Sequence, residues 1–214
     1  MRKFRLLYLN PVVLLTLCLA CTTSRAQEKQ ALRLVQTIPM PNVKGRIDQI
    51  LLDNTARRIL VAVWELGRND VFEAKDRQVI LSWTTGGQSG DMALDQAHHR
   101  LFVATRTAPQ MMLVYDPESG PEIARLPAEG RMNGVYYDGW HKRINVTCGR
   151  ELPAGFVFVF QQKAPDHYEP IGAIQVGAHG KTSLLVPELN RYYVAGSEHQ
   201  DVIRGIQGGK FEEA

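Results

Sequence analysis

A ten-residue pattern recurs four times in this chain of 214 residues, and it constrains the fold more than any other feature. Each copy contains an apolar or aromatic residue, a short polar link, an arginine, and a strand-like run that ends in valine. The copies span residues 52–61, 94–103, 137–146 and 185–194. Their arginines are spaced by 42, 43 and 48 residues, at Arg58, Arg100, Arg143 and Arg191. A period in the forties that contains only short apolar runs predicts four short strands per unit.

Short runs rich in β-forming residues, punctuated by turn signals, mark the predicted strands. None of them keeps the apolar spacing of a helix. In the first two units we expect strands at 48–52, 58–63, 70–74, 78–83, 91–94, 100–105, 111–116 and 121–126. In the third unit we expect them at 133–137, 143–147, 155–161 and 170–176. The fourth unit has strands at 182–186, 191–195 and 201–204, followed by a polar tail without a convincing fourth strand.

The sequence therefore predicts an all-β chain, a β-propeller of four-stranded blades with about four repeats. A four-stranded sheet cannot bury both of its faces alone, whereas sheets stacked around an axis bury them against each other. The repeats lie near 45–88, 89–130, 131–179 and 180–214 within a domain of residues 27–214, and residues 32–38 are expected to act as a closing strand. Three forms remain open: a small ring, an open array that associates with another chain through its open blade edges, and a remnant of a longer protein.

Three stretches give the chain a family resemblance: Gly45–Asp48, Met92–Val103 and Thr182–Arg191. In these stretches, and over most of residues 32–195, the sequence resembles the bacterial YVTN-type β-propeller repeat proteins. The resemblance implies a propeller fold and does not indicate one activity, because the family includes many proteins of unknown role. Propellers of this family usually have seven blades, so this chain is short by several blades. The Gly-His and Trp-Asp signatures of WD40 repeats are absent from the sequence.

The first 26 residues have the pattern of an export signal, with a basic start, an apolar run too short for a membrane span, and Ser24-Arg25-Ala26 before a cleavage point. Leu19-Ala20-Cys21 also resembles the end of a lipobox, which would make Cys21 a lipidation site. The expected location is therefore periplasmic or secreted, with a lipid-anchored form at the cell envelope as the alternative. Membrane contact is expected only if Cys21 is lipidated.

The charge of the expected mature chain is close to neutral. The whole sequence has a formal charge of +3, but four basic residues and no acidic residue precede Gln27, which leaves −1 for residues 27–214. A nearly neutral chain gives no overall electrostatic reason to bind nucleic acid. Cys148 is the cysteine that remains well inside this part. With no activating motif near it, it is interpreted as a small strand residue rather than a nucleophile.

Two sets of polar residues are candidate sites. The repeated Asp and Arg, and the pair His98-His99, fall in turns between strands, so they are interpreted as turn-stabilising residues rather than catalytic or metal-binding ones. In a propeller, the links that lead into each inner strand approach the mouth of the central channel. The ligand-binding candidates are the polar residues of these links: Arg46, Asp48, Asp91, Arg131, Asn133, His179 and Lys181.

These features favour an exported, non-enzymatic scaffold that binds a small ligand or an unknown protein partner. No catalytic residue, metal ligand or cofactor is predicted, because the sequence has no nucleophile triad, phosphate-binding glycine loop or paired-carboxylate motif. A lactonase-type propeller hydrolase and a single-stranded nucleic-acid-binding propeller are the alternatives, as is a remnant without independent function. The nucleic-acid alternative would need exposed aromatic residues for stacking, and Trp64, Trp83 and Trp140 are the candidates.

Overall fold

The structure is a computed structural model of the whole chain, which divides into two compact units, Met1–Ile38 and Pro39–Ala214. It describes residues 37, 39–40, 46–64, 66–73, 79–150, 155–177, 180, 182–198 and 200–207. The proposed export signal, Cys21 and all of the proposed closing strand except Thr37 lie outside these residues. All the strands described below belong to the second unit. No helix among the described residues is long and apolar enough to cross a membrane.

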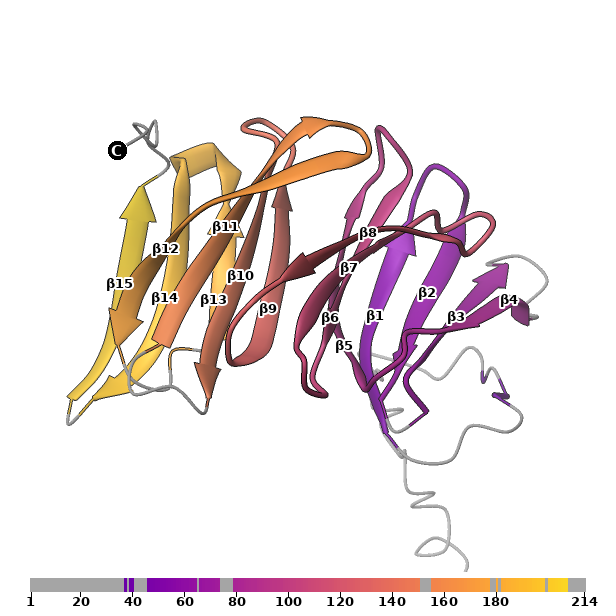
Figure 1. Ribbon diagram of the computed structural model, residues 1–214, viewed down its shortest axis with the longest axis horizontal. Coiled ribbons are helices and arrows are strands. Elements are labelled where there is room, and N and C mark those ends of the chain that lie inside the picture. The colour runs from indigo at the N-terminus through magenta and orange to yellow at the C-terminus, as the bar shows by residue number, and fades with distance from the viewer. Residues whose placement is uncertain are drawn as a thin grey trace, which may run out of the picture. The chain divides into compact units, whose positions relative to one another are not determined.

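The described strands form four antiparallel sheets in which strand order follows the chain (Figure 1). The first sheet contains β1 (Ile47–Asp53), β2 (Arg58–Val63), β3 (Arg68–Glu73) and β4 (Val79–Thr84). The second contains β5 (Ser89–Asp95), β6 (Arg100–Thr105), β7 (Met111–Tyr115) and β8 (Glu122–Pro127). The third contains β9 (Arg131–Asp138), β10 (Arg143–Arg150), β11 (Gly155–Ala164) and β12 (His167–Gly177). The fourth contains β13 (Thr182–Val186), β14 (Arg191–Glu198) and β15 (Gln200–Gln207).

This arrangement confirms the predicted all-β fold of four-stranded units, with three strands described in the last one. The first strands of successive sheets contact one another, β1 with β5, β5 with β9, and β9 with β13. The first and fourth sheets stand at opposite ends of the row in Figure 1, so the described sheets do not close into a ring.

The repeated sequence pattern forms the same turn four times. The residue directly before each repeat arginine has a positive φ of 48–57°, at Arg57, His99, Lys142 and Asn190. In the first three turns an aspartate carboxylate accepts two backbone N–H bonds, as Asp53 does from Thr55 and Ala56. The fourth turn replaces the aspartate with a 3₁₀ turn at Pro187–Leu189. The prediction that the repeated aspartates stabilise turns is therefore confirmed.

Each sheet has two packing faces, which we define by the sheet that they meet. The leading face packs on the preceding sheet and the trailing face packs on the following one. On β5, Met92 points to the first sheet from the leading face, and Ala93 points to the third sheet from the trailing face. Because side chains alternate along a strand, the repeat assigns every inner-strand position to one of these faces. The three hydrophobic clusters formed by the described residues lie at the three junctions between successive sheets.

Polar bonds also cross the junction between the second and third sheets. The buried Asp95 accepts bonds from its neighbour His98 at 2.8 Å and from Gln162 of the third sheet at 3.3 Å. Arg100 donates from Nε to Asp166, also in the third sheet, at 2.6 Å. Burial would raise the pKa of Asp95, but the bonds from His98 and Gln162 outweigh it and hold the pKa below its ordinary value. A repeat arginine therefore joins neighbouring sheets.

We expect Asp53→Ala to lower the free energy of unfolding by about 1 kcal/mol, because the N–H groups of Thr55 and Ala56 lose their acceptor. Urea titration followed by circular dichroism measures this change. Asp53→Asn is the matched control, since its side-chain oxygen can still accept both bonds and should retain most of the stability. Equal losses in the two variants would contradict the proposed role of the carboxylate oxygen.

Candidate functional site

The candidate site lies where the inner strands begin. Because neighbouring strands are antiparallel, the start of each first strand pairs with the end of the second, as Ile47 pairs with Val63 and Ser89 with Thr105. We call this border of the sheets the mouth edge. It collects residues from the links into β1, β5, β9 and β13 and from the residues that follow β2 and β6. The opposite border carries the repeated turns.

An ion cluster joins the first three sheets at the mouth edge. Nη2 of Arg106, which directly follows β6, lies 2.9 Å from an oxygen of Asp48 on β1 and 3.2 Å from an oxygen of Asp91 on β5. The second oxygen of Asp91 accepts the backbone N–H of Gly134 on β9. One arginine and one aspartate thus connect three consecutive sheets.

The ring of Trp64 lies close to three guanidinium groups beside this cluster. The guanidinium carbons of Arg46, Arg106 and Arg131 lie 4.3, 4.4 and 5.3 Å from the ring centre of Trp64. Trp64 is 4% exposed, so its ring is part of the fold as well as a surface for these cations. Cations over an aromatic face are attracted by its quadrupole, more strongly when they are shielded from water. The ring therefore offsets part of the repulsion among three like charges.

Arg106 is the central residue of the site. Its side chain is 10% exposed, and its buried Nε–H has no hydrogen-bond acceptor among the described residues. A Cβ at Gly90 would lie 2.6 Å from this nitrogen, so glycine at that position leaves room for the arginine. A buried donor without an acceptor costs free energy.

The electrostatics of the two aspartates are linked. Burial raises the pKa of Asp48 above its ordinary value, the positive charge of Arg106 opposes the rise, and the nearby carboxylate of Asp91 adds to it. Burial also lowers the pKa of Arg106, against the attraction of both carboxylates. Among the described residues, the guanidinium groups of Arg46, Arg106 and Arg131 and the carboxylates of Asp48 and Asp91 meet here.

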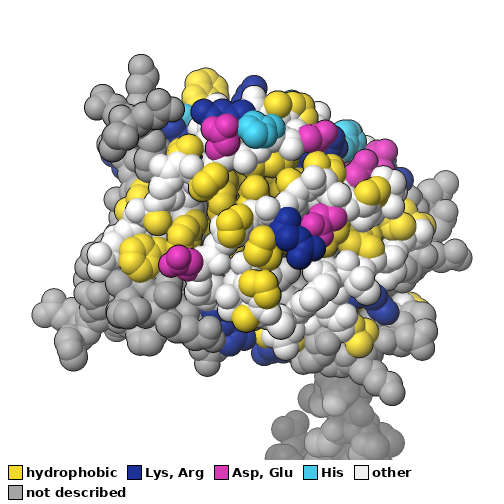
Figure 2. Space-filling view, in the orientation of Figure 1, with side chains coloured by type: hydrophobic (Ala, Val, Ile, Leu, Met, Phe, Trp, Pro, Cys, Tyr) yellow, Lys and Arg dark blue, Asp and Glu magenta, His cyan; other side chains and the backbone are white. Residues whose placement is uncertain are grey.

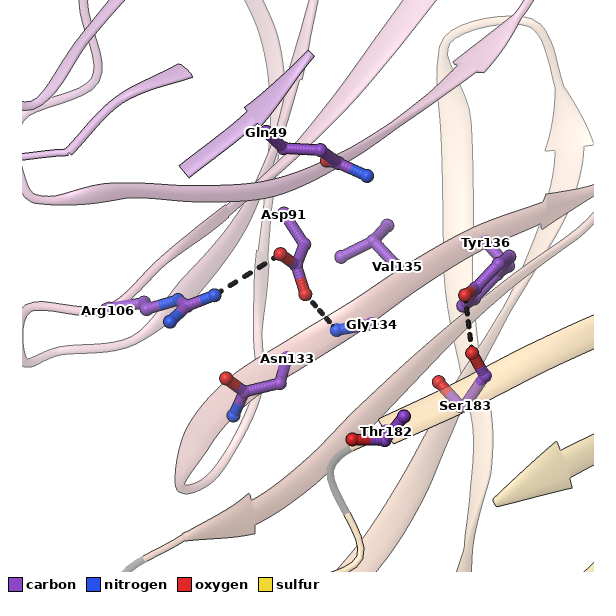
Figure 3. Close-up of a pocket in the computed structure, with 9 residues that line it drawn as sticks. All are labelled: Gln49, Asp91, Arg106, Asn133, Gly134, Val135, Tyr136, Thr182 and Ser183. Atoms are coloured by element: carbon purple, nitrogen blue, oxygen red, sulfur yellow. Dashed lines mark hydrogen bonds and ion pairs between the residues drawn. The ribbon is translucent and has the colours of Figure 1, made fainter. Parts of the chain in front are cut away.

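A pocket of about 340 Å³ opens beside Arg106 (Figure 3). Asp91 and Arg106 lie on one side of it, and Tyr136 and Ser183, joined by a bond from the tyrosine hydroxyl to the serine carbonyl, lie on the other. Its lining comes from all four sheets and their links: Gln49, Asp91, Arg106, Asn133, Gly134, Val135, Tyr136, Thr182 and Ser183. This volume suits a small molecule or a single side chain.

The structure brings five of the predicted ligand-binding candidates to the mouth edge. Asp91 and Asn133 line the pocket, and Arg46, Asp48 and Arg131 belong to the adjoining charged cluster. The other two candidates, His179 and Lys181, lie outside the described residues.

The sequence interpretation missed Trp64 and Arg106, which it did not place at the channel mouth. Both stand six residues after a repeat arginine, Arg58 and Arg100, and therefore occupy equivalent positions in successive units. A signal was available, because the end of a second strand must lie beside the start of the first strand with which it pairs. Trp64 was considered as a stacking residue, but its burial makes it a support for the arginines instead.

The other chemically interesting side chains do not line this pocket. His98 bonds to Asp95 within its turn, and His99 lies 3.6 Å from Glu118. No group of three or more His, Cys, Asp or Glu side chains within the described ranges is placed to hold a metal ion. Cys148 is fully buried, and burial raises the pKa of its thiol to about 12, so it is a poor nucleophile at neutral pH. Trp140 is 87% exposed in the third turn.

Charged and histidine side chains also gather away from the mouth. Figure 2 shows them along the upper border of one face, where Figure 1 places the turns of the β1–β2 and β11–β12 hairpins, with hydrophobic side chains through the middle. Basic and acidic groups alternate along this border, and several are paired, including Arg100 with Asp166 and His167 with Glu169. This border is therefore not a continuous basic stripe of the kind that binds nucleic acid.

Comparison with known proteins identifies the fold. No family model and no curated protein matches the sequence. A candidate 6-phosphogluconolactonase from Bacteroides fragilis matches with a TM-score of 0.64 and 12% identity, over 77% of this chain and 51% of that one. Kuenenia stuttgartiensis hydrazine synthase matches at 0.66 and 12%, over 82% and 49%. The WD40 domain of Toxoplasma gondii coronin matches at 0.58 and 9%, over 72% and 41%.

These likenesses, together with the consecutive four-stranded antiparallel sheets, define a protein of β-propeller fold. The predicted fold class is confirmed. At 9–12% identity the likeness extends to the fold alone. The chain spans about half the length of the solved structures that it matches.

We expect Arg106→Gln to raise the pKa of Asp48 further, because the variant removes the positive charge that opposes the effect of burial. Titration of the Asp48 carboxyl carbon by NMR measures the pKa in both proteins. Arg125→Gln is the control, since Arg125 pairs with Glu122 on the outer strand β8 and should leave the pKa of Asp48 unchanged. An unchanged or lowered pKa in Arg106→Gln would contradict the described cluster.

Proposed function

We propose that this protein is a non-enzymatic binding module that holds a small carboxylate-bearing ligand at the mouth edge. The observation that carries the proposal is the position of Arg106 on the wall of a pocket, beside Arg46 and Arg131 around Trp64. A guanidinium group presents a planar fork of donors that matches the two oxygens of a carboxylate.

The charge at the mouth edge favours an anion over a cation. Arg46, Arg106 and Arg131 gather around Trp64, against the two carboxylates of Asp48 and Asp91. Both aspartates already bond to Arg106, and Asp91 also accepts a backbone N–H. A cationic ligand would have to compete with these bonds, whereas an anion can accept hydrogen bonds from guanidinium N–H groups of this cluster.

The remaining pocket lining supplies hydrogen-bond donors. Asn133 contributes a side-chain amide, and Thr182 and Ser183 contribute hydroxyl groups. These groups can donate to oxygens of a ligand in the pocket. Few charged groups combined with several neutral polar ones fit a small polar molecule better than a long charged polymer.

We further propose that the protein acts outside the cytoplasm and that its blades are YVTN-type repeats. The export pattern of residues 1–26 supports the first part, and the repeated turn with its Asp and Arg supports the second. A lipid anchor at Cys21 is an alternative form of the same exported protein. Fold likeness to a candidate lactonase does not favour hydrolysis, because one fold carries many activities.

Isothermal titration calorimetry of the protein with succinate tests the proposal, with inorganic phosphate and a diamine of similar length as comparison ligands. We expect saturable binding of succinate that Arg131→Gln weakens about tenfold, corresponding to about 1.4 kcal/mol. Arg125→Gln, an exposed arginine on β8 away from the pocket, is the matched control and should bind as the unmodified protein does.

Other outcomes separate the ligand classes. Tighter binding of phosphate would redirect the assignment to phosphorylated ligands at the same arginines. Binding of the diamine in preference to both anions would overturn the proposal. Equal weakening by Arg131→Gln and Arg125→Gln would show a general charge effect in place of a site.

A further inference from the structure

The two terminal sheets expose apolar side chains at positions that are packed elsewhere in the repeat. Ile50 and Leu52 of β1 are 61% and 54% exposed, and Leu184 of β13 is 55% exposed. All three lie on inner strands, the part of a propeller sheet that normally packs against its neighbours. Scattered exposed leucines need no explanation, but the repeat assigns a definite partner to each of these positions.

On the leading face, Ile50 and Leu52 can be compared with the equivalent residues of the later units. The repeat equivalents of Ile50 are Met92 and Val135, which are 1% and 3% exposed and pack on the preceding sheet. The equivalents of Leu52 also pack on the preceding sheet in all three later units, at Leu94, Tyr137 and Leu185. Ile50 and Leu52 are therefore the leading face of a sheet that has no described sheet before it.

On the trailing face, Leu184 of the fourth sheet can be compared in the same way with the equivalent residues of the earlier units. The equivalents of Leu184 all pack on the following sheet, at Leu51, Ala93 and Tyr136. On the fourth sheet, Leu184 pairs across the strands with the half-buried Tyr193, so both belong to its trailing face. Among the described sheets, the fourth thus has an exposed apolar side chain on its trailing face, and the first has exposed apolar side chains on its leading face.

These two faces are complementary by the rule that the chain already follows. A trailing face meets a leading face at each of the three internal junctions, so the trailing face of the fourth sheet fits the leading face of a first sheet. Val61, which pairs with Ile50 on β2, is buried, so the uncovered part of the leading face is its inner strand. The inner strands of successive sheets also contact each other inside the chain.

We propose that a second copy of this chain docks head to tail, with Leu184 and Tyr193 of one copy against Ile50 and Leu52 of the other. Two such junctions relate two copies by a twofold axis and close them into one ring, which removes both unpaired faces. The matched propellers are about twice as long as the matched part of this chain, so two copies supply the material of one such propeller. Eight blades are within the range of known rings.

Size exclusion with light scattering on the full chain tests the proposal through two variants. We expect the unmodified protein to have twice the chain mass of 24.0 kDa. Ile50→Glu damages the leading face and Leu184→Glu damages the trailing face, and each variant alone should be monomeric because both of its junctions are impaired. Trp140→Glu changes a side chain that is 87% exposed in a turn, and as the control it should remain dimeric.

Mixing the two variants identifies the geometry. The Ile50→Glu chain keeps an intact trailing face and the Leu184→Glu chain keeps an intact leading face, so the mixture should form a heterodimer through one native junction. Contact between identical faces would not be restored by mixing. Leu52→Glu should behave as Ile50→Glu does, and circular dichroism confirms that each variant is folded.

Three results would overturn the proposal. A monomeric unmodified protein would show that a second copy does not cover these faces and would direct attention to other sheets or to another partner. A dimer that survives both Ile50→Glu and Leu184→Glu would place the contact elsewhere. Monomeric variants that stay monomeric after mixing would exclude head-to-tail docking. Succinate binding by a monomer would leave the proposed function standing, so the two proposals fail separately.

Discussion

The structure depends on the burial of both faces of each sheet against its neighbours. Fully burying one leucine, isoleucine or phenylalanine contributes about 1.5–3 kcal/mol, and each internal junction collects such side chains from two sheets, including Phe102, Met112 and Phe160 between the second and third. No single sheet has a core of its own. The strand alternation that sends Met92 to one side and Ala93 to the other therefore determines which sheet lies beside which, and the repeated turn keeps this alternation in register from unit to unit.

The candidate site depends on this stacking, because its residues come from several sheets and no single described sheet contains all of them. Arg106 reaches back to Asp48 of the first sheet, and Asp91 reaches forward to Gly134 of the third. The stacking buries these charged groups. Burial leaves the Nε–H of Arg106 without an acceptor among the described residues and raises the pKa of Asp48. The position of Trp64 also depends on the stacking, because its ring lies within the fold and its face contacts three guanidinium groups.

The sequence predicted the features that depend on neighbouring residues or on the repeat period, namely the strands and the turns. The predicted strands coincide with the observed ones to within a few residues, because alternation, β-branched residues and turn signals are properties of neighbouring positions. The aspartate turns were predictable for the same reason. Trp64 and Arg106 were missed because they act across sheets, Arg106 on Asp48 from 58 residues away and Trp64 on Arg131 from a different unit. No local pattern encodes such contacts, and they follow only once antiparallel pairing places the end of one strand beside the start of another.

In a repeat protein, the packing between internal units indicates which kind of surface can pack on a terminal unit. Equivalent positions of each unit contact its neighbours, so the same side-chain positions meet at every junction. The side chains that cover Met92 and Val135 inside the chain define the kind of surface that would cover Ile50, and those that meet Ala93 and Tyr136 define the kind that would meet Leu184. At the internal junctions, apolar contact on the inner strands comes with polar contact at the mouth edge, as with Arg106 and Asp48. By the same rule, a surface that covers the apolar faces of the terminal sheets would bring its own polar groups beside the mouth edge.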